Sequence, residues 1–265
     1  MARVTTAALI QMKQQGEKIT MLTSYDASFT AALEDAGVEV ILVGDSLGMV
    51  IQGQETTLPV TVDEIVYHTQ CVNRGRRNAL LIADMPFMSY SSVERALDTA
   101  ELLMKEGGAQ MVKLEGGAEQ LPVVEQLSAN GVPVCGHLGL LPQSVHKLGG
   151  YKVQGRDAES AHSIKEDAIA LEQAGAKMLV LECVPSSLAK EISQTLTIPV
   201  IGIGAGPDCD GQVLVVYDML GITPRYMPKF SKNFLEETNS VPEAIAAYVK
   251  AVKAVTFPSA EHTFE

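Results

Sequence analysis

The chain has 265 residues, 46% of them hydrophobic, and its 20 basic and 32 acidic residues give a formal net charge of −12. This length and apolar content fit one domain with a large core, and the excess of acidic residues argues against a nucleic acid partner. The apolar runs are too short to cross a membrane and the first residues lack the pattern of a signal peptide, so we expect a cytoplasmic protein with no membrane partner. The four cysteines are widely spaced, without a Cys-x-x-Cys pair, and are expected to be reduced.

Strand-like and helix-like patterns alternate along the chain. A helical stretch over residues 5–15, with Thr5 as its N-cap, precedes a series of short apolar runs typical of buried strands. Helical patterns separate these runs, so the alternation predicts a parallel sheet, and seven or eight units in this length favour a (β/α)8 TIM barrel of the α/β class. We expect a single domain over residues 1–265, in which residues 1–17 form an extra N-terminal helix that caps the barrel bottom. The expected strands lie at 18–23, 38–43, 79–83, 110–115, 132–137, 177–181 and 197–206.

Capping boxes and loop composition indicate where several helices and connections begin. Ser or Thr followed three residues later by Glu, the signature of a helix start, occurs at Thr61, Ser91 and Ser240. The connection at 48–59 is long and polar, and such loops in a barrel are usually functional. The segment at 211–221 is expected to be a helix with a short final strand nearby.

One segment at the exit of the expected seventh strand is rich in glycine. Gly202 to Gly206 has neither the spacing of a dinucleotide fingerprint nor that of a P-loop. We expect these glycines to let a large ligand approach the rim of the barrel.

Four of the expected strands lead into an acidic residue: Asp45, Asp84, Glu115 or Glu182. The carboxyl ends of barrel strands meet at one rim, which is where barrel enzymes carry their active sites. Carboxylate oxygens are the ligands that Mg2+ prefers, so Asp45 and Asp84, with Glu115 nearby, are candidate metal ligands. In the alternative reading each acid caps a following helix or pairs with a lysine.

Three further polar residues lie on or near these strand ends. Lys113 shares a strand face with Glu115, so it is expected either to neutralise a substrate carboxylate or enolate or to form a salt bridge with a neighbouring acid. Glu182 follows an apolar run, where a partly dehydrated carboxylate acts as a general base or is held by backbone donors. His137 ends the fifth strand, where it orients a ligand or a partner acid, or has a structural role only.

Nine sequence blocks are specific enough to suggest a family. They are Val-Gly-Asp-Ser-Leu-Gly-Met at 43–49, Thr-Leu-Pro-Val-Thr at 57–61, Ala-Asp-Met-Pro-Phe at 83–87, Val-Lys-Leu-Glu-Gly-Gly at 112–117, Gly-His-Leu-Gly-Leu at 136–140, Gly-Gly-Tyr-Lys-Val-Gln-Gly-Arg at 149–156, Leu-Glu-Cys-Val-Pro at 181–185, Ile-Gly-Ile-Gly-Ala-Gly at 201–206 and Pro-Lys-Phe at 228–230. Together they resemble the ketopantoate hydroxymethyltransferase family over nearly the whole chain.

The resemblance implies a (β/α)8 barrel that binds Mg2+ and forms a homo-oligomer, commonly a decamer. It also implies transfer of a hydroxymethyl group from 5,10-methylenetetrahydrofolate to 3-methyl-2-oxobutanoate through an enolate, which gives 2-dehydropantoate for pantothenate biosynthesis. By matching motifs, Asp45 and Asp84 would bind the metal, and the substrate with it, while Glu115 lies in or near the metal's shell. Ser46 and Lys113 would hold the oxo acid, and Glu182 would accept the proton.

Two other functions are compatible with parts of this pattern. A magnesium-dependent lyase or mutase of the phosphoenolpyruvate mutase and isocitrate lyase type also has a Gly-Asp-Ser turn and acids at the rim. Such an enzyme needs an Arg-rich site for a phosphate or second carboxylate, or a catalytic Cys loop, and neither stands out here. The other is a non-catalytic barrel that binds an oxo acid or serves as an assembly scaffold. A scaffold has no need for Asp45, Asp84, Lys113 and Glu182 together on one rim.

Overall fold

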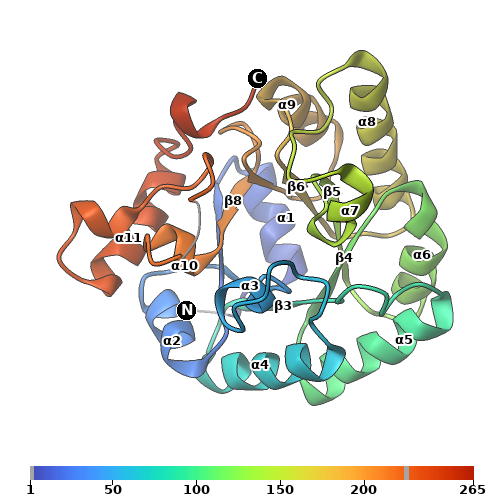
Figure 1. Cartoon of the computed structure of the whole chain (residues 1–265), viewed down its shortest axis with the longest axis horizontal. Helices are drawn as coiled ribbons and strands as arrows, with labels where there is room; N and C mark the ends of the chain where they lie inside the picture. The colour runs from blue at the N-terminus through green and yellow to red at the C-terminus, as the bar shows by residue number, and fades with distance from the viewer. Residues whose placement is uncertain (1–2, 224–226) are drawn as a thin grey trace.

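Eight parallel strands close into a barrel in the computed structural model, which describes residues 3–223 and 227–265 (Figure 1). The strands follow one another around the barrel in chain order, and β1 closes it by pairing with β8 from Ile19 opposite Gly211 to Leu22 opposite Leu214. The predicted (β/α)8 fold is therefore confirmed. The strands are β1 Ile19–Thr23, β2 Val40–Val43, β3 Leu80–Asp84, β4 Met111–Glu115, β5 Val134–Gly139, β6 Met178–Glu182, β7 Val200–Ile203 and β8 Gly211–Leu214.

Long helices form a ring outside the strands, and the short helices α3 and α7 lie inside that ring in Figure 1. The α-helices are α1 Thr6–Gln14, α2 Ala27–Asp35, α3 Leu47–Val50, α4 Val62–Gly75, α5 Val93–Glu101, α6 Leu121–Ala129, α7 Val145–Leu148, α8 Ala158–Gln173, α9 Ser186–Thr195, α10 Val216–Met219 and α11 Val241–Lys253. A π-helical turn, Leu102–Glu106, extends α5. Turns of 3-10 helix occur at Ala118–Gln120, Pro142–Ser144, Phe234–Glu237 and Ala260–His262.

The helix starts follow the local sequence closely. Thr61 accepts a hydrogen bond from the N–H of Glu64 and completes a capping box, and Ser240 caps α11 through the N–H of Glu243. The prediction for Ser91 is wrong by one residue, because Ser92 is the N-cap of α5 and accepts from Arg95. A capping hydroxyl must reach a free N–H of the first turn, and the chain enters α5 one residue later than the Ser-x-x-Glu pattern indicates.

The segment at 211–221 differs from its predicted structure. Its first residues form β8, and only the single turn of α10 is helical. Gly211 explains this assignment, because an added Cβ would lie 2.4 Å from the carbonyl oxygen of Ile19 on β1. The glycine allows the close approach of two backbones that closes the barrel.

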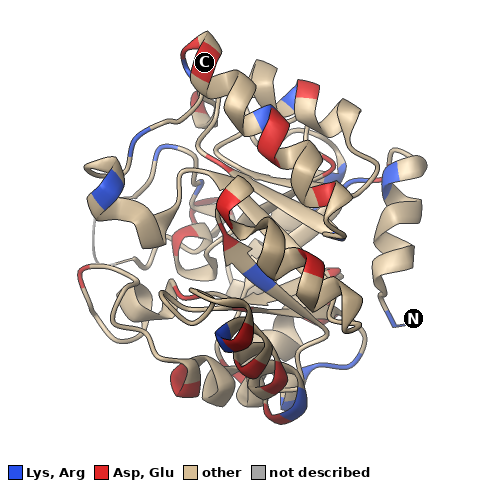
Figure 2. Cartoon of the chain, turned by 90° about the vertical axis from the view of Figure 1, so that its right-hand side faces the viewer, with Lys and Arg blue, Asp and Glu red and all other residues tan. Residues whose placement is uncertain are grey.

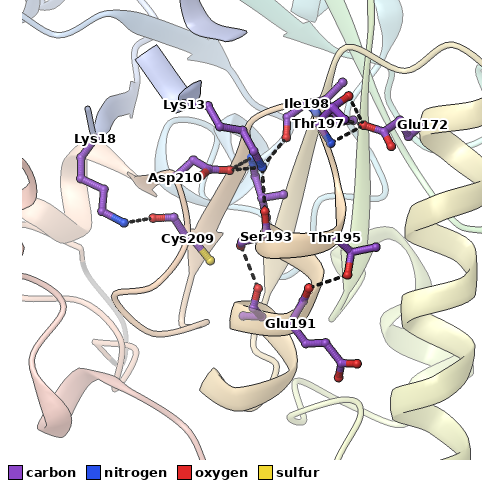
Figure 3. Close-up of polar contacts among 12 residues, drawn as sticks. Lys13, Lys18, Glu172, Glu191, Ser193, Thr195, Thr197, Ile198, Cys209 and Asp210 are labelled. Carbon is purple, nitrogen blue, oxygen red and sulfur yellow. Dashed lines mark hydrogen bonds and ion pairs between the residues drawn. The ribbon is translucent and has the colours of Figure 1, made fainter. Parts of the chain in front are cut away.

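The N-terminal helix α1 and the residue before it are bonded to segments that precede three of the strands, and Figure 3 shows the contacts of Lys13. Before the helix, the N–H of Val4 donates to the carbonyl of Asn78 ahead of β3. Near its end, the Lys13 ammonium donates to the carbonyl of Ile198 at 2.9 Å and to the Asp210 carboxylate at 2.7 Å. These contacts support the expected position of the helix across the barrel bottom; residues 1 and 2 of the predicted cap lie outside the described residues.

Charged residues lie both on the outer helices and in the connections between elements. Figure 2 shows acidic residues spread over several helices rather than gathered at one end. Within the part of the chain that the structure describes, no helix is both long enough and apolar enough to span a bilayer. The cysteines Cys71, Cys135, Cys183 and Cys209 form no disulfide.

Candidate active site

A cavity of about 720 Å3 opens at the carboxyl ends of the strands. The bottom of this cavity is formed by the carboxyl-terminal rim of the barrel, where the acidic strand ends were expected to meet. The structure brings all of the predicted site residues to its wall, together with His137. They are Asp45, Ser46, Asp84, Lys113, Glu115 and Glu182.

The turn after β2 holds Asp45 and Ser46 in place. The N–H of Asp45 donates to Oδ2 of Asp84 at 3.1 Å, and the Ser46 hydroxyl lies 2.8 Å from the Tyr25 hydroxyl. A Cβ added to Gly44 would lie 2.8 Å from Oγ of Ser46 and 3.4 Å from Oδ2 of Asp84. Glycine at this position therefore lets the turn bring both side chains toward the end of β3.

Lys113 forms a buried ion pair with Asp84. The two residues are paired in the register of β3 and β4, and Nζ of Lys113 lies 2.5 Å from Oδ1 of Asp84 with side chains only 6% and 3% exposed. Burial lowers the pKa of Lys113, but the carboxylates of Asp84, Glu115 and Asp45 outweigh it, so the net shift is well above the ordinary value. Lys113 is thus a permanent cation inside the cavity. An ammonium has three donors, so the ion pair is compatible with a further contact to a substrate.

Asp45 lies where negative charge accumulates. Burial, and then the charges of Asp84 and Glu115, raise its pKa to about 8. Lys113 offsets only part of this repulsion. A further cation bound at this point would favour the ionised form of Asp45.

Gln143, a residue that the sequence analysis did not single out, connects two of these acids. Its side-chain amide donates to Oδ2 of Asp45 at 2.8 Å, and its backbone N–H donates to Oε2 of Glu115 at 3.0 Å. The Tyr90 hydroxyl donates to the remaining amide oxygen at 2.5 Å. Gln143 lies in the 3-10 turn that follows β5 and belongs to no strand, so no periodicity in the sequence marks it.

His137 lies between two carboxylates on neighbouring strands. Its Nε2 is 3.3 Å from Oε2 of Glu182, and its Nδ1 is 3.5 Å from Oε1 of Glu115. Burial and the charge of Lys113 lower its pKa, but the neighbouring carboxylates of Glu115 and Glu182 raise it to about 9 overall. The imidazolium can therefore hold both carboxylates in a fixed orientation.

The acids at the floor suit a divalent ion that also takes ligands from a substrate. Within the described ranges, no three His, Cys, Asp or Glu side chains are grouped so that they would hold an ion unaided. Magnesium usually takes one or two protein carboxylates and completes its shell with water and substrate oxygens. Asp45 and Asp84 supply such a pair, and the surplus of negative charge around Asp45 fits a cation there.

The cysteines beside the site are poor nucleophiles. Burial raises the pKa of Cys135 to about 12, and burial with the charge of Glu182 raises the pKa of Cys183 further. Both thiols are therefore protonated near neutral pH, whereas the thiolate is the reactive form. The site offers carboxylates and an ammonium for its chemistry rather than a catalytic cysteine.

The sequence is similar to one family of enzymes over almost its whole length. Residues 3–260 match the family described as ketopantoate hydroxymethyltransferase. A protein from Nitrosococcus oceani, described as 3-methyl-2-oxobutanoate hydroxymethyltransferase, is 62% identical over 264 residues that cover 100% of both chains. A protein of the same description from Shewanella loihica is 58% identical with the same coverage.

Solved structures of other enzymes share the barrel at much lower sequence identity. Phosphoenolpyruvate phosphomutase from Streptomyces platensis has a TM-score of 0.61 at 12% identity, over 82% of each chain. A 2,3-dimethylmalate lyase, described as a member of the PEP mutase/isocitrate lyase superfamily, has a TM-score of 0.58 at 14% identity, over 97% of this chain and 86% of its own. Phosphonopyruvate hydrolase, solved with oxalate and Mg2+, has a TM-score of 0.61 at 12% identity, over 97% and 99%. These similarities show the fold alone.

Proposed function

The chain belongs to the ketopantoate hydroxymethyltransferase family, and we propose that it transfers a hydroxymethyl group from 5,10-methylenetetrahydrofolate to 3-methyl-2-oxobutanoate, with Mg2+ as cofactor. One water is consumed, and the products are 2-dehydropantoate and tetrahydrofolate. The family match over residues 3–260 carries the reaction class. The cluster of acids around Lys113 in one cavity supports the residue roles that follow.

Asp45 and Asp84 would hold the magnesium ion, with Glu115 in or next to its shell. The donor set supports this role, since the ion needs hard oxygen ligands and the carboxylates need a cation. When bound, the ion polarises the keto group of the oxo acid and offsets charge that develops on its oxygen. Lys113, inside the same cavity, adds a second fixed positive charge for the substrate carboxylate or the enolate.

Ser46 and Glu182 would contact the substrate from two sides. The Ser46 hydroxyl, held by Tyr25, donates to the bound oxo acid. Glu182 accepts the proton that leaves C3, and the enolate carbon then forms the new carbon–carbon bond to the one-carbon unit. Both carbon–nitrogen bonds of that unit break, the consumed water supplies the hydroxyl group, and each freed folate nitrogen takes up a proton. The contact of His137 with Oε2 of Glu182 supports this role, because it fixes the carboxylate that must face C3.

Two loops would keep water away from the enolate. Met49, on the short helix α3 at the start of the 48–60 connection, and Tyr151 from the 149–156 loop both line the cavity, and the Tyr151 hydroxyl lies 3.8 Å from Sδ of Met49. This contact supports closure by the two loops over the bound substrates. We also expect a cytoplasmic homo-oligomer, a decamer by analogy with the family, which light scattering on the purified protein would measure.

The test of the proposed function is exchange of the C3 proton of 3-methyl-2-oxobutanoate into deuterated water, followed by proton NMR without any folate. The native enzyme should exchange this proton with Mg2+ and far more slowly after chelation. Glu182→Gln should bind the oxo acid with unchanged affinity and lose the exchange, because the amide is not a base. Rapid exchange by Glu182→Gln would remove Glu182 from its role, and absence of exchange by the native enzyme would contradict the enolate mechanism.

The transfer itself is tested with a folate donor labelled in its one-carbon unit. We expect the label in 2-dehydropantoate, as a hydroxymethyl group bonded to C3. Cleavage of a carbon–carbon bond in an oxo acid, without uptake of the label, would instead favour the lyase or mutase alternative.

A further inference from the structure

The cavity has a closed inner end and an open outer end. At the inner end, Asp45, Asp84, Lys113 and Glu115 are at most 5% exposed. At the outer end, Tyr151 is 52% exposed, and the wall continues with partly exposed aromatic and basic side chains. A volume of 720 Å3 lies in the range of roughly 300–1,000 Å3 that holds a drug-sized ligand, so a small branched oxo acid at the inner end leaves most of the cavity free.

Two phenylalanine rings form part of the outer wall. Phe230 and Phe264 come from different segments of the chain, and both rings lie against Gly204 at the exit of β7. A Cβ added to Gly204 would be 3.0 Å from Cδ1 of Phe230 and 3.1 Å from Cε2 of Phe264. The expectation that these glycines let a large ligand reach the rim is wrong at Gly204, where the two rings fill that space. A ligand in the outer cavity therefore meets the rings.

The segment that carries Phe264 is held in place by backbone contacts. The N–H of Ser186, at the start of α9, donates to the carbonyl of Phe264 at 3.0 Å, and the chain end lies next to α9 in Figure 1. Nζ of Lys229 donates to the carbonyl of Thr263 at 2.8 Å and lies 5.0 Å from the centre of the Phe264 ring. The ring is thus fixed from two sides, and the Lys229 ammonium still has donors for a ligand.

The outer end also differs from the inner end in charge. Lys152, Lys229 and Glu55 line the cavity and are exposed, so this end carries more positive than negative charge, although the chain as a whole has a net charge of −12. Flat aromatic surfaces with ammonium groups beside them fit a ligand with a planar ring system and a carboxylate tail. A folate donor has both features, and its one-carbon unit must reach the inner end.

We propose that Phe230 and Phe264 bind the ring system of the one-carbon donor and that Lys229 faces its carboxylate tail. This assignment rests on the proposed function, and it makes the two phenylalanines specificity residues for the second substrate. The tail segment around Phe264 then serves as a wall of the donor site. The oxo acid, bound at the inner end, does not depend on it.

The experiment compares two reactions of the same enzyme. The first is exchange of the C3 proton with oxo acid and Mg2+, which needs no donor, and the second is transfer at varied concentrations of methylenetetrahydrofolate. Phe264→Ala should raise the KM for the donor about tenfold, the effect of one lost ring contact, and leave at least half of the exchange rate. Phe264→Leu, which keeps apolar bulk, should give a smaller increase, and Lys229→Met should raise the donor KM without changing the KM for the oxo acid.

A direct measurement complements the kinetics. Calorimetric titration with tetrahydrofolate should show weaker binding by Phe264→Ala in the same proportion as the change in KM. Tyr67→Ala serves as the control, because Tyr67 is an aromatic residue that is 61% exposed on α4 and does not line the cavity. Its donor KM and its exchange rate should match those of the native enzyme.

Each outcome decides between the assignments. The donor site would be overturned if Phe264→Ala and Lys229→Met both keep the donor KM and the tetrahydrofolate affinity within twofold of the native values. The proposed function would still stand in that case, provided that exchange and transfer are intact. Equal loss of exchange and transfer in Phe264→Ala and Phe264→Leu would also overturn it, because the ring would then shape the oxo acid site. Absence of exchange and transfer in the native enzyme would refute the proposed function itself.

Discussion

Replacing Lys113 with methionine should destabilise the protein and change its response to Mg2+. The side chains of Lys113 and Asp84 are 6% and 3% exposed, and their charged atoms are 2.5 Å apart. Removing one partner of such a buried pair costs about 3–5 kcal/mol because the other charge is left without compensation. Each kcal/mol of lost stability lowers the melting temperature of a chain of this size by roughly 2–4 °C, so we expect the melting temperature of Lys113→Met to fall by about 6–20 °C.

The assay is thermal unfolding with and without Mg2+. Without Lys113 the three carboxylates at the inner end lose the ammonium that offsets their charge, so Mg2+ should raise the melting temperature of Lys113→Met more than that of the native protein. The double variant Asp84→Asn/Lys113→Met should lose less than the sum of the single variants. Lys105→Met, which removes an exposed ion pair with Glu101, is the matched control and should unfold like the native protein.

Two results would refute this reasoning. The first is a melting temperature of Lys113→Met within 2 °C of the native value in the absence of Mg2+, which corresponds to a loss of at most about 1 kcal/mol. Such a result would mean that Lys113 contributes no net charge compensation inside the cavity. Equal stabilisation of both proteins by Mg2+ would show that the ion and Lys113 do not share the same carboxylates.

Three further predictions test other parts of the structure. His137→Gln should lower the rate constant of C3 exchange by about 10- to 100-fold with little change in the KM for the oxo acid, because a displaced base costs rate rather than binding. Lys13→Met should lower the free energy of unfolding in urea by about 2–3 kcal/mol and leave exchange unchanged, since its ammonium bonds Asp210 and two carbonyls far from the cavity. Burial raises the pKa of Glu34, but N–H donors including Ala79 lower it more, so the net value is below 4.5. An acid with a lowered pKa stabilises the folded state above pH 4.5, and this stabilisation is lost as the pH falls through the pKa of the folded state. The free energy of unfolding of the native protein should therefore exceed that of Glu34→Gln by a constant amount above about pH 5, and by less at lower pH.

Register in the barrel decided between alternatives that the sequence left open. The sequence allowed Lys113 to pair with either neighbouring acid, and the structure sets it opposite Asp84 because β3 and β4 pair these two positions. Likewise β5 sets His137 opposite Glu115 on β4, and the imidazole also reaches Glu182 on β6. A strand's own pattern predicts which side chains share a face, but not which residue on the next strand lies beside them.

The sequence by itself determined the barrel and the rim that carries the acids. Alternating strands and helices require parallel strands, and parallel strands bring all their carboxyl ends to one side, so Asp45, Asp84, Glu115 and Glu182 had to meet. Only the tertiary structure decided the contacts made by loops and by the chain end. Gln143 bridges two acids, and the ring of Phe264 lines the cavity, although neither follows a periodic pattern. The physical reason is that periodicity and capping act between near neighbours in the chain, whereas loop contacts depend on how distant segments pack after the barrel has closed.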